Sequence, residues 1–245
     1  MTALQRERLD GGIEVVRLDR PQARNALDSA SLAEFEAALG ELGGDDDLRV
    51  LVLSTTSERA LCAGADVAES LDGDGAVARM EAFARVYALI EGFPAPTVCV
   101  CVGNVVGAGA ELATGCDLRV GGDNLKLAWP GGRLGAPVGP ARLTPLVGLS
   151  IAKELIFTGR TLGMEEARAL GLLHRTAAAA LAEAAALELA REIAAHPPEG
   201  MRRLKAMFRD ITGAAEHVSA ENAALVEWQR TGGGLPRGGL RGGQG

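Results

Sequence analysis

The chain has 245 residues, of which 47% are hydrophobic but only 3% aromatic, and its formal net charge is −7. This supplies one large domain whose core must be filled mainly by Ala, Val and Leu. The acidic balance argues against a nucleic-acid partner, and no apolar run reaches the roughly 18–20 residues that would predict a membrane partner. The negative net charge does not exclude an anionic small molecule as ligand, because local cations and backbone amides can bind one.

The cysteines and the N-terminus indicate the compartment. Residues 1–10 contain Arg, Glu and Asp with no apolar segment, so a signal peptide is not expected. The cysteines show no C-x-x-C spacing, and Cys99 and Cys101 alternate within an apolar run, as small buried hydrophobes do. We therefore expect reduced thiols and a cytoplasmic location.

The first half of the chain alternates between two patterns. Loose alternation of apolar and polar residues predicts a strand at 13–18, and near-continuous apolar runs predict strands at 48–53 and 97–102. Apolar residues at helical spacing predict helices at 31–39 and 76–91, the second ending before a pair of prolines. Strands that alternate with helices predict an α/β fold.

After residue 144 the pattern becomes helical. Helices are predicted at 150–158, 164–170, 178–195, 198–211 and 215–230. We therefore divide the chain into an α/β core (1–190), a C-terminal helical region (191–232) and a Gly-rich tail (233–245) that is expected to be disordered.

Two segments have the composition of ligand-binding loops. The first, residues 61–67 (LCAGADV), follows the second strand, and its small residues either let a ligand approach the backbone or simply form a tight turn. The second, residues 98–116, runs from a buried strand through glycines into a short helix that contains Glu111. The free N–H groups and dipole of a helix start attract an oxyanion.

Glu111 has a structural and a functional interpretation. A glutamate in a first helical turn is stabilised by the helix dipole, by about 0.3–1 kcal/mol, without any catalytic role. Its neighbours here are small and apolar, however, which favours a buried carboxylate, and Ala108 lies on the same helix face. The sequence thus places a carboxylate beside a predicted oxyanion site.

Other chemistries find little support in the sequence. The pair Gly107 and Gly109 resembles part of a dinucleotide-binding loop, but Leu112 occupies the third glycine position. No nucleophile elbow or P-loop pattern occurs, and the three histidines have no metal-ligand spacing, so no metal site is expected.

Taken in order, five segments of the chain resemble the enoyl-CoA hydratase/isomerase (crotonase) family. They are 18–27 (LDRPQARNAL), 62–66 (CAGAD), 103–111 (GNVVGAGAE), 116–119 (CDLR) and the helix of Pro198 to Lys205. The resemblance implies a crotonase-like spiral of ββα units with a C-terminal helical trimerisation region. It also implies an acyl-CoA thioester as substrate, with coenzyme A as part of that substrate and no permanently bound cofactor, and assembly as a homotrimer or as a hexamer of two trimers.

The resemblance also assigns roles to individual residues. It implies that the backbone N–H groups of Ala65 and Ala108 form the oxyanion hole and that Glu111 is the catalytic carboxylate. Lys205 matches a basic residue that reaches the CoA phosphates. The remaining positions along the substrate and CoA path are Ala23, Arg24, Ala63, Asp66, Val67 and Gly107.

One position departs from the family pattern. Efficient hydratases of this family use a second glutamate after a proline, and here Gly131 follows Pro130. A carboxylate from the loop after the first oxyanion segment is a candidate replacement: Glu69, Asp72 or Asp74. Each positioned acid or base contributes about 10²–10⁴-fold to a rate, so its loss matters.

Three functions remain open after this departure. The first is hydration of a 2-enoyl-CoA in fatty-acid or related acyl-CoA metabolism, with Glu111 as the single acid/base. The second is acyl-CoA binding without turnover. The third is enoyl-CoA isomerisation or another reaction of the family, such as decarboxylation or ring chemistry.

Overall fold

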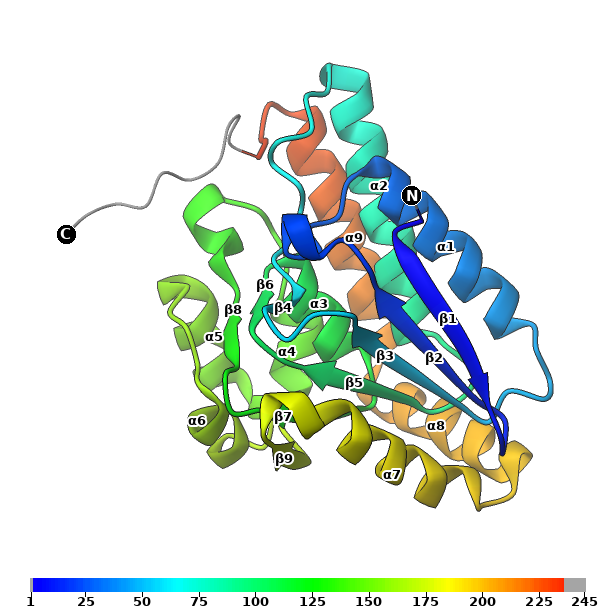
Figure 1. The fold of residues 1–245 in the computed structure, drawn as a ribbon. Coiled ribbons are helices and arrows are strands. Elements are labelled where there is room, and N and C mark those ends of the chain that lie inside the picture. The colour runs from blue at the N-terminus through cyan, green and yellow to red at the C-terminus, as the bar shows by residue number, and fades with distance from the viewer. Residues whose placement is uncertain (1, 236–245) are drawn as a thin grey trace.

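The computed structural model describes residues 2–235 and has two sheets surrounded by helices (Figure 1). The larger sheet has the strand order β1-β2-β3-β5-β7-β9, and the smaller sheet has the order β4-β6-β8. All neighbouring strands are parallel except β1 and β2, which form an antiparallel pair at one edge. The predicted α/β class is confirmed.

Three successive units of the chain repeat one pattern: a strand in the large sheet, a strand in the small sheet, and a helix. The units are β3 (Val50–Thr55), β4 (Ala60–Cys62) and α2 (Gly73–Glu91); β5 (Thr97–Cys101), β6 (Asn104–Val106) and α3 (Ala108–Gly115); and β7 (Leu118–Gly122), β8 (Lys126–Ala128) and α4 (Pro140–Val147). This repetition is the predicted spiral of ββα units. It also stacks the loops between β4 and α2 and between β6 and α3 on one side of the small sheet.

The remaining elements lie before and after these units. They are β1 (Leu4–Leu9), β2 (Ile13–Leu18), α1 (Ser29–Gly43), α5 (Leu149–Thr158), α6 (Met164–Ala169), β9 (Arg175–Ala177), α7 (Ala182–Ala194), α8 (Pro198–Thr212) and α9 (Ala214–Arg230), with short 3₁₀ turns at Pro21–Ala23, Pro130–Leu134 and Ala179–Leu181. The predicted strands and helices are all present, with ends shifted by a few residues. The sequence prediction missed β1, β7, the three-residue strands and α4.

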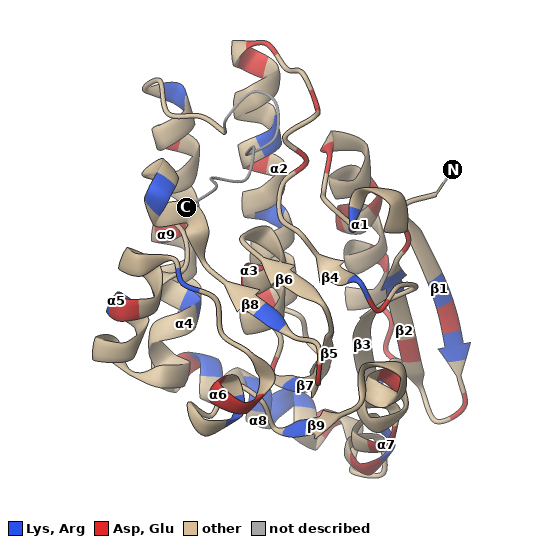
Figure 2. Cartoon of the chain, turned by 60° about the vertical axis from the view of Figure 1, so that its left-hand side comes forward, with Lys and Arg blue, Asp and Glu red and all other residues tan. Residues whose placement is uncertain are grey.

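Each face of the large sheet has its own apolar core. Side chains alternate along a strand, so Val50 and Val52 face one side while Leu51 and Leu53 face the other. The first face packs against α7, and the second against α1, α2 and α3. Charged side chains lie mainly on the outer helices and on edge strand β1 (Figure 2). The predicted domain boundary at residue 190 falls inside α7, whose small residues pack on the sheet.

The two last helices have different environments. Helix α9 packs on α2 and α4, with Val218, Leu225 and Val226 buried. Helix α8 has an exposed apolar face made of Leu204, Met207, Phe208 and Ile211.

Within residues 2–235, no helix is both long and apolar enough to cross a membrane. The predicted Gly-rich tail lies outside the described residues from 236 onward.

Candidate functional site

The start of helix α3 supplies a free backbone donor. Gly107 precedes the helix with φ +55°, a conformation that favours glycine, and its N–H donates to the Ala128 carbonyl at 3.0 Å. Ala108 is the first helical residue, so its N–H has no intrahelical acceptor. No hydrogen bond formed within residues 2–235 uses that N–H.

The loop after β4 supplies a second donor. The residues on either side of Ala65 bridge to Leu27, because the Leu27 N–H donates to the Gly64 carbonyl at 2.9 Å and the Asp66 N–H donates to the Leu27 carbonyl at 2.8 Å. These bonds fix the loop but leave the Ala65 N–H without an acceptor in the described part of the chain.

These two loops approach each other closely because both contain glycine. A Cβ added to Gly64, which has φ +108°, would lie 3.2 Å from the Val106 carbonyl oxygen and 4.0 Å from the Ala108 nitrogen. A Cβ on Gly109 would collide with the Cys62 carbonyl. Glycines therefore bring together two backbone donors that lie more than 40 residues apart.

A mainly apolar cavity of about 180 Å³ lies beside these donors. We call it the oxyanion cavity. Its backbone wall comes from Ala63, Gly64, Ala65, Val67, Val106, Gly107 and Ala108. Side chains of α2 and α9 form the opposite wall, namely Met80, Phe83, Tyr87, Leu225 and Trp228, and Pro130 to Val138 contribute Gly131 and its neighbours. Such a cavity suits an apolar acyl group whose carbonyl oxygen meets the two donors.

Glu111 lies one turn after Ala108 and is fully buried. It accepts a hydrogen bond from Nη1 of Arg142 at 2.9 Å, and the same nitrogen donates to Glu221 at 2.7 Å. The other oxygen, Glu111 Oε1, has no hydrogen-bond partner among the described residues. Glu111 is not part of the cavity wall, whereas Tyr87 is, and the Arg142 guanidinium lies over the Tyr87 ring at 4.8 Å.

This environment changes the proton affinity of Glu111. Burial raises the pKa of the carboxyl from 4.5 to about 7. The charge of Arg142 lowers this pKa, the charge of Glu221 raises it, and the Trp129 indole acts in the same direction as Arg142. A carboxyl with such a pKa exchanges protons near neutral pH, which is the property required of a general acid or base.

Gly131 occupies the predicted position of the missing glutamate. It lies in the 3₁₀ turn Pro130–Leu134 and belongs to the oxyanion cavity wall. A Cβ at this position would lie 3.1 Å from Val138 Cγ2 and 3.4 Å from the Ala136 carbonyl oxygen. The loop of residues 136–138 therefore occupies the space that a longer side chain at residue 131 would need.

The candidate replacement carboxylates do not reach this space. Glu69 accepts from Arg79 and from the Ser29 N–H, while Asp72 caps α2 by accepting from the Gly75 N–H. Neither Glu69, Asp72 nor Asp74 is part of the oxyanion cavity wall. The second carboxylate near Glu111 is instead Glu221, which reaches it only through Arg142.

Several predicted substrate-binding residues gather at the first donor loop. The Ala63 N–H donates to the Arg24 carbonyl at 3.0 Å, which places Ala23 and Arg24 beside this loop. Arg24 is exposed, and its φ of +52° is held by the neighbouring buried Asn25, whose amide donates to Thr55 and to the Ala60 carbonyl. The Arg24 side chain is exposed, but neither Ala23 nor Arg24 is part of the oxyanion cavity wall.

Asp66 has a structural environment. Its carboxylate accepts from Arg20 at 3.1 Å and from the Ala68 N–H at 3.0 Å. The side chain thereby holds the donor loop in place, and it is absent from the oxyanion cavity wall, unlike the adjacent Val67.

The position of Lys205 differs from the predicted role. The side chain is buried, and its ammonium donates to Asp117 at 2.7 Å and to the Ala95 carbonyl at 3.0 Å. These bonds join α8 to the ends of β5 and β7, and Lys205 does not line the oxyanion cavity. Contact with CoA phosphates is therefore not supported within this chain, because the ammonium is already paired.

Sequence reasoning missed the charged group around Glu111. Arg142 lies in α4, while Glu221 and Asn222 lie in α9; Asn222 accepts from Arg142 Nη2 at 3.1 Å. Arg142 lies in a proline-containing stretch of sequence that carries no local signal of a buried ion pair. Its partners lie about 80 residues away, at a separation that no periodicity reveals.

Comparisons with known proteins point to one family. The sequence model of the family described as "Enoyl-CoA hydratase/isomerase" matches residues 8–228. The chain is 30% identical over 201 residues to "Short-chain-enoyl-CoA hydratase" of Clostridium acetobutylicum, covering 80% of this chain and 77% of that protein. It is 36% identical over 242 residues to "Probable enoyl-CoA hydratase EchA17" of Mycobacterium tuberculosis, covering 96% and 92%.

A solved structure shares the fold. The crystal structure of an enoyl-CoA hydratase/isomerase from Xanthobacter autotrophicus Py2 superposes with a TM-score of 0.85 at 24% identity, over 96% of this chain and 90% of that chain. At this identity the likeness establishes the crotonase-like fold and no more.

Proposed function

Because the chain belongs to the enoyl-CoA hydratase/isomerase family, we propose that it is an enzyme that processes acyl-CoA thioesters, with Glu111 as its single acid/base. The observation that carries this proposal is the meeting of two free N–H groups, those of Ala65 and Ala108, at an apolar cavity one helical turn from a buried carboxylate. We propose hydration of a 2-enoyl-CoA as the reaction.

In the proposed reaction, the thioester carbonyl oxygen accepts hydrogen bonds from Ala65 and Ala108. As a water oxygen bonds to C3, the carbonyl becomes an enolate, and the two donors stabilise its negative charge. Glu111 takes the proton from that water and then delivers a proton to C2. One carboxyl can perform both transfers in turn because its pKa, raised to about 7, makes both protonation states accessible.

The reaction is tested by incubating the wild-type protein with 2-enoyl-CoAs of several chain lengths. The proposal predicts loss of the conjugated thioester absorbance and formation of a 3-hydroxyacyl-CoA in at least one case. A shift of the double bond without added water would instead identify an isomerase, and loss of carbon dioxide a decarboxylase. No product from any enoyl-CoA would refute the enzymatic proposal.

A second candidate function is acyl-CoA binding without turnover. The observations that favour it are the glycine at position 131 and the ion pair that holds Glu111 behind the cavity wall. It predicts saturable heat of binding for acyl-CoAs in calorimetry with the thioester unchanged by mass spectrometry. Any catalytic product excludes it.

We also propose that the protein assembles as a homotrimer or as a pair of trimers. The exposed apolar face of α8, with its residues at helical spacing from Leu204 to Ile211, supports an interface there. Light scattering tests the assembly, and Phe208→Glu is expected to lower the measured mass to that of one chain.

The four buried free thiols support the cytoplasm as the compartment.

A further inference from the structure

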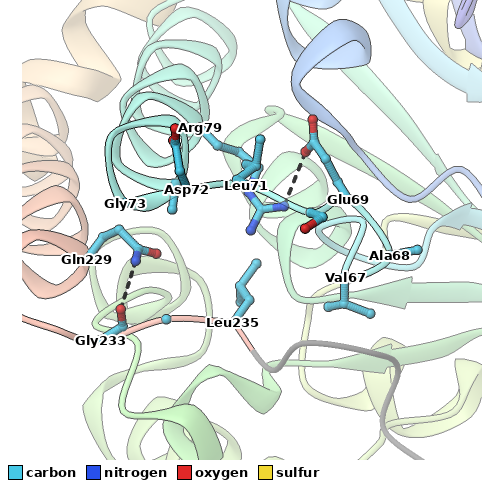
Figure 3. A pocket seen from close by; sticks show the side chains of 13 residues that line it. Val67, Ala68, Glu69, Leu71, Asp72, Gly73, Arg79, Gln229, Gly233 and Leu235 are labelled. Carbon is cyan, nitrogen blue, oxygen red and sulfur yellow. Dashed lines mark hydrogen bonds and ion pairs between the residues drawn. The ribbon is translucent and has the colours of Figure 1, made fainter.

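A second cavity of about 340 Å³ adjoins the oxyanion cavity. It lies between residues 67–73, the start of α2 and the end of α9 (Figure 3). Val67 and Leu235 belong to the walls of both cavities. We call this second space the polar cavity, because Glu69, Asp72, Arg79 and Gln229 line it.

The same two helices form walls of both cavities. Along α2, Tyr87, Phe83 and Met80 line the oxyanion cavity, and the next residue toward the N-terminus, Arg79, lines the polar cavity. Along α9, Trp228 lines the oxyanion cavity and the following residue, Gln229, lines the polar cavity. An acyl chain that follows these helices therefore passes from apolar to polar surroundings.

Arg79 carries unused hydrogen-bonding capacity. Its side chain is 6% exposed, and Nη1 donates to the Asp66 carbonyl at 3.1 Å and to Glu69 at 3.2 Å. Its buried Nε finds no acceptor anywhere in residues 2–235. A buried guanidinium nitrogen without a partner is unfavourable, so an acceptor from a ligand would stabilise it.

Gln229 offers the complementary group. Its Nε2 donates to the Gly233 carbonyl at 2.8 Å, and this bond identifies which end of the amide is the nitrogen. The amide oxygen, Oε1, is buried and has no donor in the described part of the chain. Two residues that line the polar cavity, Arg79 of α2 and Gln229 of α9, thus each carry one buried side-chain atom without a partner in the described part of the chain (Figure 3).

The charges of the polar cavity disfavour an anion. Glu69 and Asp72 contribute two carboxylates against the single guanidinium of Arg79. A carboxylate at the end of an acyl chain would meet this excess of negative charge. A hydroxyl group carries no charge and both accepts and donates a hydrogen bond, so it matches the cavity best.

We propose that the polar cavity binds the far end of the acyl group and selects 2-enoyl-CoA thioesters whose chain ends in a hydroxyl group. The hydroxyl oxygen accepts from the Arg79 guanidinium, and its hydrogen is donated to Gln229 Oε1. The choice of thioester rests on the proposed function, whereas the preference for a hydroxyl rests on the cavity itself.

Binding of unreactive analogues tests the selection without requiring turnover. Calorimetry compares saturated acyl-CoAs of six, eight and ten carbons that end in a methyl, a hydroxyl or a carboxylate. We expect the hydroxyl-ended thioester to bind at least about tenfold more tightly than its methyl-ended counterpart at one length or more. The near-isosteric Arg79→Met and Gln229→Met should each remove this preference, so that the hydroxyl-ended and methyl-ended thioesters bind within about twofold of each other.

Arg85→Met is the matched control, because Arg85 is an exposed arginine of the same helix and, among residues 2–235, pairs only with Glu36. It should keep the preference. If Arg79→Met does not fold, Gln229→Met carries the test alone. Equal affinities for the methyl and hydroxyl ends, or tighter binding of the carboxylate end, would overturn the proposal.

An equal loss of affinity for all ligands in Arg79→Met would also overturn the proposed selection. If Arg79→Met weakened CoA itself and every thioester to the same extent, Arg79 would contact the part common to all of them. A hydroxyl preference in a protein without turnover refutes the proposed reaction and supports the selection. Turnover without any preference for the hydroxyl end supports the proposed reaction and refutes the selection.

Discussion

Glu111 and Arg142 form a buried ion pair in which Nη1 of the arginine lies 2.9 Å from Oε2 of the glutamate. Both side chains are essentially inaccessible, at 0% and 1% exposure, and Arg142 shares the same nitrogen with Glu221. Removing one member of such a pair leaves a buried charge uncompensated. The pair therefore holds the carboxylate in place and also adjusts how readily it takes a proton.

Glu221 should influence the pH at which the enzyme works. Its negative charge raises the pKa of Glu111, so Glu221→Gln should lower that pKa. Water activation requires the ionised carboxylate, so wild-type kcat/KM should rise with pH to a plateau above about 7. In Glu221→Gln the rising limb should move to lower pH.

The matched control for this shift is Glu227→Gln, which removes an exposed carboxylate from the same helix. Its profile should coincide with that of the wild type. A rising limb that stays in place in Glu221→Gln would show that Glu221 does not act on the catalytic group.

The stability of the fold should depend on Glu111 in a defined pH window. The pKa is raised from 4.5 to about 7 on folding, so the folded chain holds this proton more tightly than the unfolded chain. The ionised carboxylate therefore costs stability as the pH rises from 4.5 through 7. The free energy of unfolding of Glu111→Gln, relative to that of the wild type, should therefore increase across this window. The increase from pH 4 to pH 8 should be at least about 1 kcal/mol. Urea unfolding of both proteins at pH 4 and pH 8 measures this change. If the difference in unfolding free energy between variant and wild type were the same at both pH values, the raised pKa would be contradicted.

The Ala108 donor can be removed by a single substitution. Proline lacks the N–H and is tolerated at the first position of a helix, where Ala108 lies. Ala108→Pro should lower kcat about 10²–10³-fold, as loss of one oxyanion donor does elsewhere. Ala214→Pro, at the first position of α9, is the control for proline at a helix start. Comparable kcat in Ala108→Pro and the wild type would exclude this N–H from catalysis.

Lys205 should be important for stability and not for CoA affinity. Its ammonium joins Asp117 to the Ala95 carbonyl, and loss of hydrogen bonds to a charged group of this kind costs about 1.5–3 kcal/mol. Lys205→Met should lower the free energy of unfolding by an amount of this order while KM changes less than about twofold. A large increase in KM with unchanged stability would restore the phosphate-binding role that the resemblance implies.

The extent to which sequence predicted the structure depends on the distance between interacting residues. Val50 and Leu51 alternate within one run, so the buried strand was recognisable locally. The three-residue strands are too short for a periodic pattern, and α4 was hidden by Pro140 and Pro145 at its start and interior. Hydrogen bonds to neighbouring strands and packing against α3 and α9 stabilise these elements instead.

For the candidate site, too, the success of prediction depended on the sequence separation of the interacting residues. The donor loops around Ala65 and Ala108 could be predicted because each is a continuous segment with its own glycines. The partners of Glu111 could not, since Arg142 and Glu221 come from α4 and α9 and meet only in the folded chain. The ion pair of Lys205 could not be predicted for the same reason, because its partner Asp117 lies 88 residues away.

If Glu111 performs the proton transfers, turnover by Glu111→Gln is the decisive measurement. Hydration of the best enoyl-CoA substrate should fall at least about 100-fold while calorimetry shows unchanged affinity for the saturated thioester. Glu188→Gln, which alters an exposed glutamate of α7, should retain wild-type turnover. Equal turnover by Glu111→Gln and the wild type would exclude Glu111 as the group that transfers protons.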